Sequence, residues 1–287
     1  MKVLVTGAGG QLGTDLTRLL EGQPHHQVVG ATRAMLDVED RDQVMSAVTS
    51  LSPQLIIHAA AWTAVDACES DPDHAWRANA LACRYVAEGA AATGAHLVVV
   101  STDYVFDGTA AHPYTEWDQT NPLSIYGRSK LGGENEIRAL LPGATIARTS
   151  WVCGANGSNM VKTLLRLAAS GTSPLRFVDD QRGCPTFTED LASMLARLGI
   201  ARLPGTFHVT NQGSTSWFGF AQEVLRAAGL DPSRVEPITT DQLDPPRPAR
   251  RPANAVLDNT ALRLSGIPLL PDYREPLERT VKTLLAS

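Results

Sequence analysis

The sequence predicts an α/β protein built on a doubly wound parallel sheet, with a smaller C-terminal part that packs on it. Over the first 150 residues, short apolar runs alternate with segments of helical spacing. The runs are continuously apolar, which is typical of strands buried on both faces of a sheet. Alternation of such strands with helices indicates a parallel sheet that binds ligands beyond the carboxyl ends of its strands.

The expected elements follow a regular strand–helix order. Strands are expected at 2–6, 27–32, 54–60, 96–100 and 144–149, and helices at 11–20, 40–51, 75–93 and 126–141. Beyond Trp151 the expected strands are shorter and proline is more frequent, and residues 237–252 are expected to be irregular. The sequence therefore predicts a sheet domain at 1–150 and a second part at 151–287.

Composition excludes several classes of protein. A hydrophobic content of 43% is that of a globular chain and not of a disordered one. The formal net charge of −5 argues against a nucleic-acid partner, because such proteins carry a basic excess. Apolar runs fall short of the roughly 18 residues that a membrane span needs, and the N-terminal run is too short for a signal peptide. We therefore expect a cytoplasmic protein with neither membrane nor nucleic-acid partners.

The cysteine spacing also indicates a cytoplasmic protein, and it argues against a zinc site. The four cysteines are Cys68, Cys83, Cys153 and Cys184. No two of them form a C-x-x-C pair, and no histidine cluster accompanies them, so a zinc site is not expected. Scattered thiols fit a reducing cytosol, where disulfides are rare.

A glycine-rich turn follows the first expected strand. Gly7, Gly10 and Gly13 are spaced G-x-x-G-x-x-G and open the first helix. Glycines in such a turn allow a tight bend, close approach of a pyrophosphate and close packing of helix on strand. The helix N-terminus adds free N–H groups for phosphate. The turn predicts a dinucleotide-binding domain of Rossmann type over 1–150; a glycine-rich turn without a ligand is the alternative.

The residue after the second strand bears on the choice of dinucleotide. An acidic side chain there would bind the ribose 2′-hydroxyl of NAD, whereas an arginine can pair with the 2′-phosphate of NADP. Arg33 directly follows the strand expected at 27–32, and the first carboxylate after it is Asp37. This favours NADPH over NADH, with a solvated arginine as the alternative.

Tyr126 and Lys130 stand four residues apart at the start of a helix, so both side chains lie on one face. We expect the ammonium group, together with the positive charge of an oxidised nicotinamide, to lower the pKa of the phenol, which then serves as general acid in the reduction of a ketone. Lys130 would also bind the nicotinamide ribose. Thr102, at a strand end, would orient the carbonyl, and Ser101 is the competing candidate. A capping aromatic and a solvated lysine are the alternative for the pair.

Six further motifs extend this pattern along the chain. They are His58–Glu69 (HAAAWTAVDACE), Ser101–Gly108 (STDYVFDG), Pro122–Glu134 (PLSIYGRSKLGGE), Arg148–Trp151 (RTSW), Asp180–Thr186 (DQRGCPT) and Ala249–Pro252 (ARRP). Together with the glycine turn and Y-x-x-x-K, they resemble the extended short-chain dehydrogenase/reductase family. Within it they are similar to the family of dTDP-4-dehydrorhamnose reductases, over essentially the whole chain.

The resemblance implies a reaction and a set of contacts. The reaction is reduction of the C4 ketone of dTDP-4-dehydro-L-rhamnose, a dTDP-activated deoxyhexose, to dTDP-L-rhamnose with NADPH or NADH, for bacterial cell-surface polysaccharides. The implied cofactor contacts are Gly10, Gln11 and Leu12 at the pyrophosphate, Asp37 and Val38 near the adenine, and Ala61, Trp62 and Thr63 beside the ribose and phosphates. Thr102, Asp103 and Trp151 would contact the nucleotide-sugar, and residues 151–287 would supply most of its binding part.

The resemblance also bears on metal binding and on the oligomeric state. Some family members bind Mg²⁺ at a homodimer contact, and the matching positions here are Asp15 and Glu189. Two solvated acids are the favoured interpretation, so no metal site is predicted. Arg250 and Arg251 would suit the ligand diphosphate or a loop that closes over it, with a solvated basic turn as the alternative.

Three other functions remain open at this point. A ketoreductase for another dTDP-deoxyhexose would carry nearly the same motifs. A dehydratase would carry a glutamate after Asp103, where this chain has Tyr104. A non-catalytic regulatory subunit, like the methionine adenosyltransferase β subunit, would keep the fold without turnover, and the full set of Thr102, Tyr126 and Lys130 argues against it.

Overall fold

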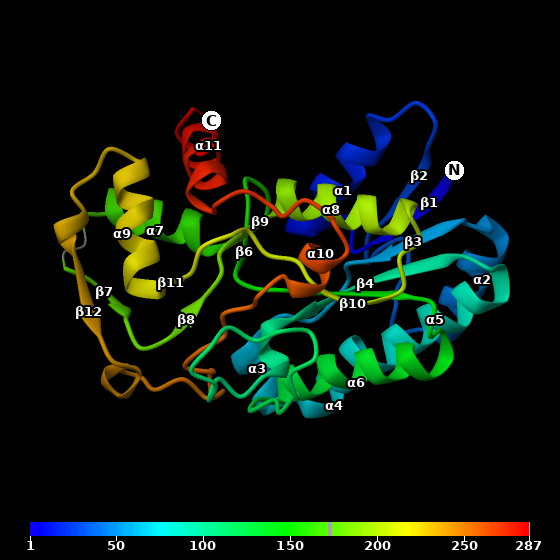
Figure 1. Ribbon diagram of the computed structural model, residues 1–287, viewed down its shortest axis with the longest axis horizontal. Coiled ribbons are helices and arrows are strands. Elements are labelled where there is room, and N and C mark those ends of the chain that lie inside the picture. The colour runs from blue at the N-terminus through cyan, green and yellow to red at the C-terminus, as the bar shows by residue number, and fades with distance from the viewer. Residues whose placement is uncertain (172–173, 287) are drawn as a thin grey trace.

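The computed structural model describes residues 1–171 and 174–286, and its centre is a six-stranded sheet with the order β10-β5-β4-β3-β1-β2 (Figure 1). The strands are β1 (Lys2–Thr6), β2 (Gln27–Ala31), β3 (Leu55–His58), β4 (His96–Thr102), β5 (Thr145–Thr149) and β10 (Gly205–His208). Every pairing in this sheet is parallel. The strand order reverses between β1 and β3, and the prediction of a doubly wound parallel sheet is confirmed.

Helices cover both faces of the sheet. One face packs against α1 (Gln11–Glu21) and α8 (Thr188–Ile200), and the other against α2 (Arg41–Leu51), α5 (Ala82–Thr93) and α6 (Ile125–Leu140). Alternate residues of each strand enter different cores: Val3 and Val5 pack with Leu16 of α1, whereas Leu4 packs with Val44 of α2. Burial on both faces explains why the strands are apolar throughout.

The helix expected at 75–93 is interrupted by a π-helical turn. It consists of α4 (Pro72–Trp76), the π turn η1 (Arg77–Leu81) and α5, and α3 (Val65–Ser70) precedes it. The buried Asn79 in the turn accepts the N–H of Trp62 and donates to the Trp62 carbonyl and to Ser129 Oγ. The extra residue of the π turn aims Asn79 at these groups, and α-helical periodicity alone does not reveal it.

The C-terminal half builds a second core beside the sheet, on the left in Figure 1. Its helices are α7 (Met160–Ala169), α9 (Trp217–Ala227) and α11 (Arg274–Leu285), and its paired strands are β7 (Leu175–Val178) with β12 (Val235–Ile238), β8 (Arg182–Gly183) with β11 (Thr215–Ser216), and β6 (Val152–Cys153) with β9 (Thr186–Phe187). Its short 3-10 turns are η3 (Pro232–Arg234) and η4 (Thr240–Gln242), and a third, η2 (Asp103–Val105), directly follows β4 in the sheet domain. The expectation of irregular structure over 237–252 is wrong for Pro237 and Ile238, which pair with β7 as the end of β12. From 239 to 252 only η4 interrupts an irregular path.

A single boundary at residue 150 does not separate the two cores. Strand β10 pairs with β5 and completes the sheet, and α8 and α10 (Thr260–Leu264) pack into the sheet's own core. The chain therefore crosses back twice after residue 150. These elements extend the sheet beyond β5 and complete the apolar cover of the face on which α1 packs.

Among the described residues, no helix has both the length and the apolar character needed to cross a membrane.

Candidate active site

Two adjoining cavities lie at the carboxyl ends of the sheet strands, beside the point where the strand order reverses. One cavity, lined by Tyr126 and here called the Tyr126 cavity, has a volume of about 410 Å³. The other, lined by Arg33 and here called the Arg33 cavity, has a volume of about 420 Å³. Both are lined by Gly7, Gly10, Ala59 and Ala61, so they meet at the glycine-rich turn. This is the position at which doubly wound sheets bind dinucleotides.

The glycine turn leaves no room for side chains. Gly7 has φ of 71°, and a Cβ on it would lie 2.7 Å from the Ala60 nitrogen. A Cβ on Gly13 would lie 2.1 Å from the Gly7 carbonyl oxygen, so α1 packs directly on the turn. Gly10 is the N-cap residue of α1, and within the described chain no side chain caps its N–H groups. Gln11, Leu12 and Gly13 line the Tyr126 cavity there, and this N-terminus therefore fits a pyrophosphate.

The Arg33 cavity collects the residues expected near the adenosine half of a cofactor. Its wall includes Arg33, Asp37, Val38, Ala61 and Trp62. Thr63 lies instead on the wall of the Tyr126 cavity.

A carboxylate that sequence reasoning missed lies in the same wall. Glu39 Oε1 is 3.2 Å from the Arg33 guanidinium and also 3.2 Å from His74 Nε2, and the His74 ring stacks on Trp62. A bound 2′-phosphate would compete with Glu39 for Arg33.

Helix α6 places Tyr126 and Lys130 in its first two turns. The helix begins at Ile125, and the Ser124 hydroxyl accepts the Gly127 N–H. A Cβ on Gly127 would lie 2.3 Å from the Tyr104 carbonyl oxygen, so the helix start packs tightly on the turn after β4. Tyr126 and Lys130 are both buried and both line the Tyr126 cavity. The structure thus brings the two residues together beside the glycine turn.

Burial dominates the titration of both groups. It raises the pKa of Tyr126, with Asp103 and Tyr104 adding to the rise, and a hydrogen bond with Thr102 only partly offsets it. It also lowers the pKa of Lys130, whose Nζ donates to the Val100 carbonyl at 2.8 Å. The expected lowering of the phenol pKa by Lys130 does not hold in this structure, because desolvation outweighs any such effect. Tyr126 is consequently a neutral phenol at physiological pH.

Thr102 and Ser101, adjacent on β4, point to different partners. The Thr102 hydroxyl accepts the Tyr104 N–H and donates to Asp103 Oδ1 at 2.9 Å. Ser101 donates to Glu134 on α6. Ser101 is committed to Glu134, whereas the Thr102 hydroxyl is the one that lowers the pKa of Tyr126, so Thr102 is favoured over Ser101 as the hydroxyl beside the phenol.

Asp103 is a buried carboxylate in the cavity wall. Its Oδ2 accepts the Ser150 hydroxyl at 2.9 Å, and burial raises its pKa to about 6. The hydrogen bonds from Ser150 and Thr102 lower the pKa but do not cancel the desolvation cost. The carboxylate can therefore change its protonation state near neutral pH.

Trp151 has a second tryptophan as its neighbour. Its ring lines the Tyr126 cavity and stacks on Trp217, the first residue of α9, which also lines the cavity. Trp217 was missed by the sequence analysis, because it belongs to none of the motifs and only the fold brings α9 to the cavity.

The two arginines of the proline-rich loop differ in exposure, and so do the two acidic residues considered for Mg²⁺. Arg251 is half-buried and pairs through both guanidinium nitrogens with Asp66 of α3, whereas Arg250 is exposed. Asp15 is buried and accepts a hydrogen bond from Asn156, and Glu189 is exposed on α8. The described residues contain no group of three or more His, Cys, Asp or Glu side chains placed to hold a metal. Nothing here supports Mg²⁺ at Asp15 and Glu189.

The parallel sheet, the glycine turn and the buried tyrosine–lysine pair define an extended short-chain dehydrogenase/reductase, the class indicated by the motifs. The family model for the RmlD substrate binding domain matches residues 1–286. The chain belongs to this family.

Named relatives are similar over nearly the full length. A dTDP-4-dehydrorhamnose reductase of Streptomyces griseus is 42% identical, and the alignment covers 98% of this chain and 93% of that protein. A crystal structure of a dTDP-4-dehydrorhamnose reductase from Clostridium acetobutylicum matches with a TM-score of 0.95 and 40% identity over 99% of this chain and 100% of that one. One from Bacillus anthracis in complex with NADP matches with a TM-score of 0.93 and 38% identity, over 98% and 99%.

Proposed function

We propose that the chain reduces the C4 ketone of dTDP-4-dehydro-L-rhamnose to dTDP-L-rhamnose, with NADPH as the reductant. The observation that carries the proposal is that the buried Tyr126 and Lys130 line the same cavity as the N-terminus of α1. Full-length similarity to proteins named for this reaction supports the choice of substrate.

Each residue has a part in the chemistry. When bound, NADPH supplies a hydride to the carbonyl carbon. Tyr126 donates its phenolic proton to the carbonyl oxygen, which becomes the C4 hydroxyl, and the phenolate then regains a proton from solvent. Thr102 bonds the phenol and helps to orient the carbonyl, and Lys130 binds the nicotinamide ribose.

The cofactor would lie across both cavities. Gly7, Gly10 and Gly13 shape the turn that receives its pyrophosphate, with the free N–H groups at Gln11 and Leu12. We propose NADPH over NADH, because Arg33 lines the adenosine-side cavity and can pair with a 2′-phosphate. The NADP complex of the Bacillus anthracis relative supports this choice.

The substrate would occupy the side of the Tyr126 cavity toward the second core. Asp103 and Trp151 would contact the nucleotide-sugar, and Trp217 adds an apolar surface. We further propose a cytoplasmic enzyme, since all four cysteines lie in the described chain as buried free thiols. The homodimer expected from the family resemblance stays a prediction that light scattering of the purified chain tests.

The decisive experiment replaces Tyr126 and follows NADPH oxidation with dTDP-4-dehydro-L-rhamnose. Tyr126→Phe is expected to lower kcat by on the order of 10² or more while NADPH binding changes within a few-fold. Tyr85→Phe, on α5, is the matched control and should retain full turnover. Unchanged turnover in the Tyr126 variant would rule out the proposed acid. A panel of other dTDP-4-keto-6-deoxyhexoses, compared by kcat/KM, tests the choice of sugar.

A further inference from the structure

We propose that Glu134 is a positioning residue: it fixes α6 against the end of β4 and thereby sets Tyr126 and Lys130 relative to Thr102. This inference rests on the proposed function. It assigns a role to a buried carboxylate that lines neither cavity and contacts none of the reacting groups.

Helix α6 presents three side chains toward the sheet at intervals of four residues. Tyr126, Lys130 and Glu134 are all buried, as this spacing on one helix face predicts. Lys130 Nζ donates to the Val100 carbonyl, and Glu134 Oε1 accepts the Ser101 hydroxyl. Two successive residues of β4 are thus each bonded to α6.

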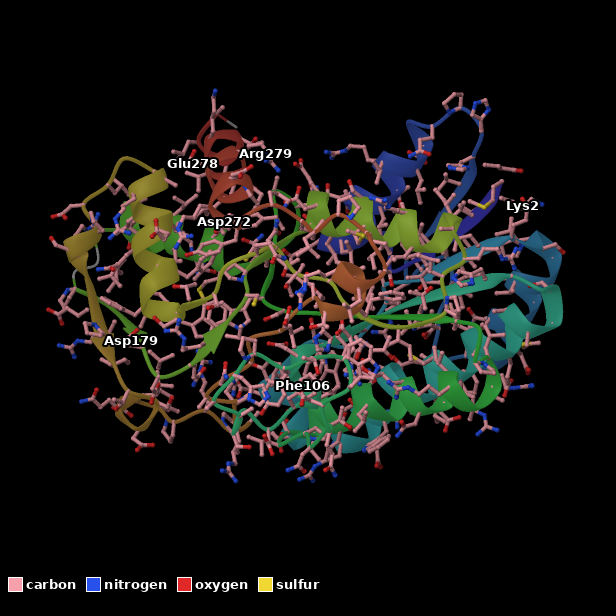
Figure 2. The ribbon with its side chains drawn as sticks, in the orientation of Figure 1. Lys2, Phe106, Asp179, Asp272, Glu278 and Arg279 are labelled. Carbon is pink, nitrogen blue, oxygen red and sulfur yellow. The ribbon has the colours of Figure 1, made fainter. Side chains whose placement is uncertain are left out.

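The same carboxylate is bonded to the next strand. Arg148 of β5 donates from Nε to Glu134 Oε1 at 2.9 Å and from Nη2 to Oε2 at 2.8 Å. Arg148 is the register partner of Ser101 in the sheet. Its guanidinium carbon lies 5.2 Å from the centre of the ring of Phe106, which is fully buried and is labelled in Figure 2. Glu134 therefore joins α6, β4 and β5 at one point.

This arrangement is hard to explain by stability alone. A buried ion pair gains little over well-packed apolar residues, because two charges must leave water. A bidentate pair does fix a single geometry, because both carboxylate oxygens of Glu134 and two guanidinium nitrogens of Arg148 take part in its hydrogen bonds. A shift of α6 along β4 would break these bonds and would also displace the phenol from Thr102. Displacements of about 1 Å at a reacting group can slow a reaction by roughly a hundredfold.

The first test removes only the hydrogen bond between Glu134 and Ser101 of β4. Ser101→Ala is expected to lower kcat by roughly ten- to a hundredfold, and to move the alkaline limb of the pH profile of kcat, because the phenol changes its surroundings. The dissociation constants for NADPH and for dTDP should stay within about twofold, which separates positioning from direct ligand contact. Ser101→Thr keeps the hydroxyl and is expected to recover most of the lost kcat.

A second variant removes the charges together. Glu134→Gln combined with Arg148→Met removes both charges of the buried pair together, so neither is left without its partner, and the variant is expected to fold while it lowers kcat in the same way. Arg138→Gln is the matched control. Arg138 donates to Glu134 Oε2 at 2.7 Å from the solvent side and is 41% exposed, so this variant should keep the parent kcat and pH profile.

The proposal is overturned if Ser101→Ala and the double variant keep the parent kcat and pH profile. It is also overturned if Ser101→Thr is as impaired as Ser101→Ala, or if kcat falls only in proportion to the unfolded fraction seen by circular dichroism. Failure of this inference is distinguishable from failure of the proposed function. An inactive Tyr126→Phe variant beside a fully active Ser101→Ala variant rejects the role of Glu134 alone.

Discussion

The indole rings of Trp151 and Trp217 stack face to face, with centroids 3.6 Å apart and planes 7° apart. Trp151 has φ of 45°, a left-handed conformation that is strained for a bulky residue. A Cβ on Gly183 would lie 2.5 Å from the Trp151 ring, so the indole is held between Gly183 and Trp217. Contacts with a strand of the second core and with α9 thus fix one wall of the cavity.

Removing Trp217 should weaken substrate binding more than chemistry. We expect Trp217→Ala to raise KM for the nucleotide-sugar by about tenfold with kcat within a few-fold, because an aromatic pair contributes on the order of 1 kcal/mol. Trp217→Phe should be milder. Steady-state kinetics measures both constants, and near-UV circular dichroism reports the stack. Trp117→Ala, 68% exposed, is the control, and equal KM in the Trp117 and Trp217 variants would contradict the assignment.

A methyl group at Gly13 should disrupt the glycine turn. Because a Cβ there would lie 2.1 Å from the Gly7 oxygen, Gly13→Ala is expected to destabilise the fold by roughly 1–3 kcal/mol and to abolish measurable NADPH binding. Gly143→Ala is the control, since nothing lies within 4 Å of the Cβ that it would add. Urea unfolding measures the stability of both variants, and titration with NADPH measures their binding. Tight NADPH binding by the Gly13 variant would show that the glycine turn does not receive the pyrophosphate.

The buried carboxyl of Asp103 should make stability depend on pH. Its folded pKa of about 6 lies above the unfolded value, so the folded state binds more protons between about pH 4 and 6. The contribution of Asp103 to the free energy of unfolding therefore falls as pH rises through that window. The total loss is about 3 kcal/mol, and it is complete at pH 7.5.

The variant Asp103→Asn isolates this effect. We expect it to be more stable than the parent by roughly 1–3 kcal/mol at pH 7.5, and the difference to shrink as pH falls toward 4. Urea unfolding of both proteins across this range measures the difference, in which the other titrating groups cancel. A difference that grows on acidification would show that the sign is wrong.

Arg251 should hold the proline-rich segment 243–252 on α3. Its guanidinium bonds both carboxylate oxygens of Asp66 and the Ala249 carbonyl. Arg251→Ala is expected to speed amide hydrogen exchange in this segment and to raise KM for the nucleotide-sugar several-fold. Arg250→Ala, an exposed neighbour, should change neither quantity. If both variants exchange alike, the Asp66 contact does not order the segment.

Local patterns were sufficient for much of the sheet and for the glycine turn. The continuous apolar runs placed β1 to β5, because a strand buried on both faces has an apolar residue at nearly every position. Gly7 and Gly13 were recognisable because their role depends on neighbours a few residues away. The pairing of Tyr126 with Lys130 followed from helical spacing alone.

Long-range placement was not visible in the same way. Strand β10 follows β5 by more than fifty residues in the chain yet pairs with it, and nothing local marks that return. Trp217 belongs to a cavity wall only because the fold brings α9 to the Tyr126 cavity. The direction of the Tyr126 pKa shift was also misjudged, since it depends on how completely the phenol is desolvated.

By itself, the sequence determined the class of fold, the glycine turn and the placing of Tyr126 and Lys130 on one helix face, because each rests on a short periodicity that backbone geometry imposes. Only the tertiary structure decided which hydroxyl faces the phenol, what Glu134 joins, and where the chain re-enters the sheet. Those features depend on desolvation and on contacts between residues distant in the chain, and such contacts exist only once the sheet and its helices have packed.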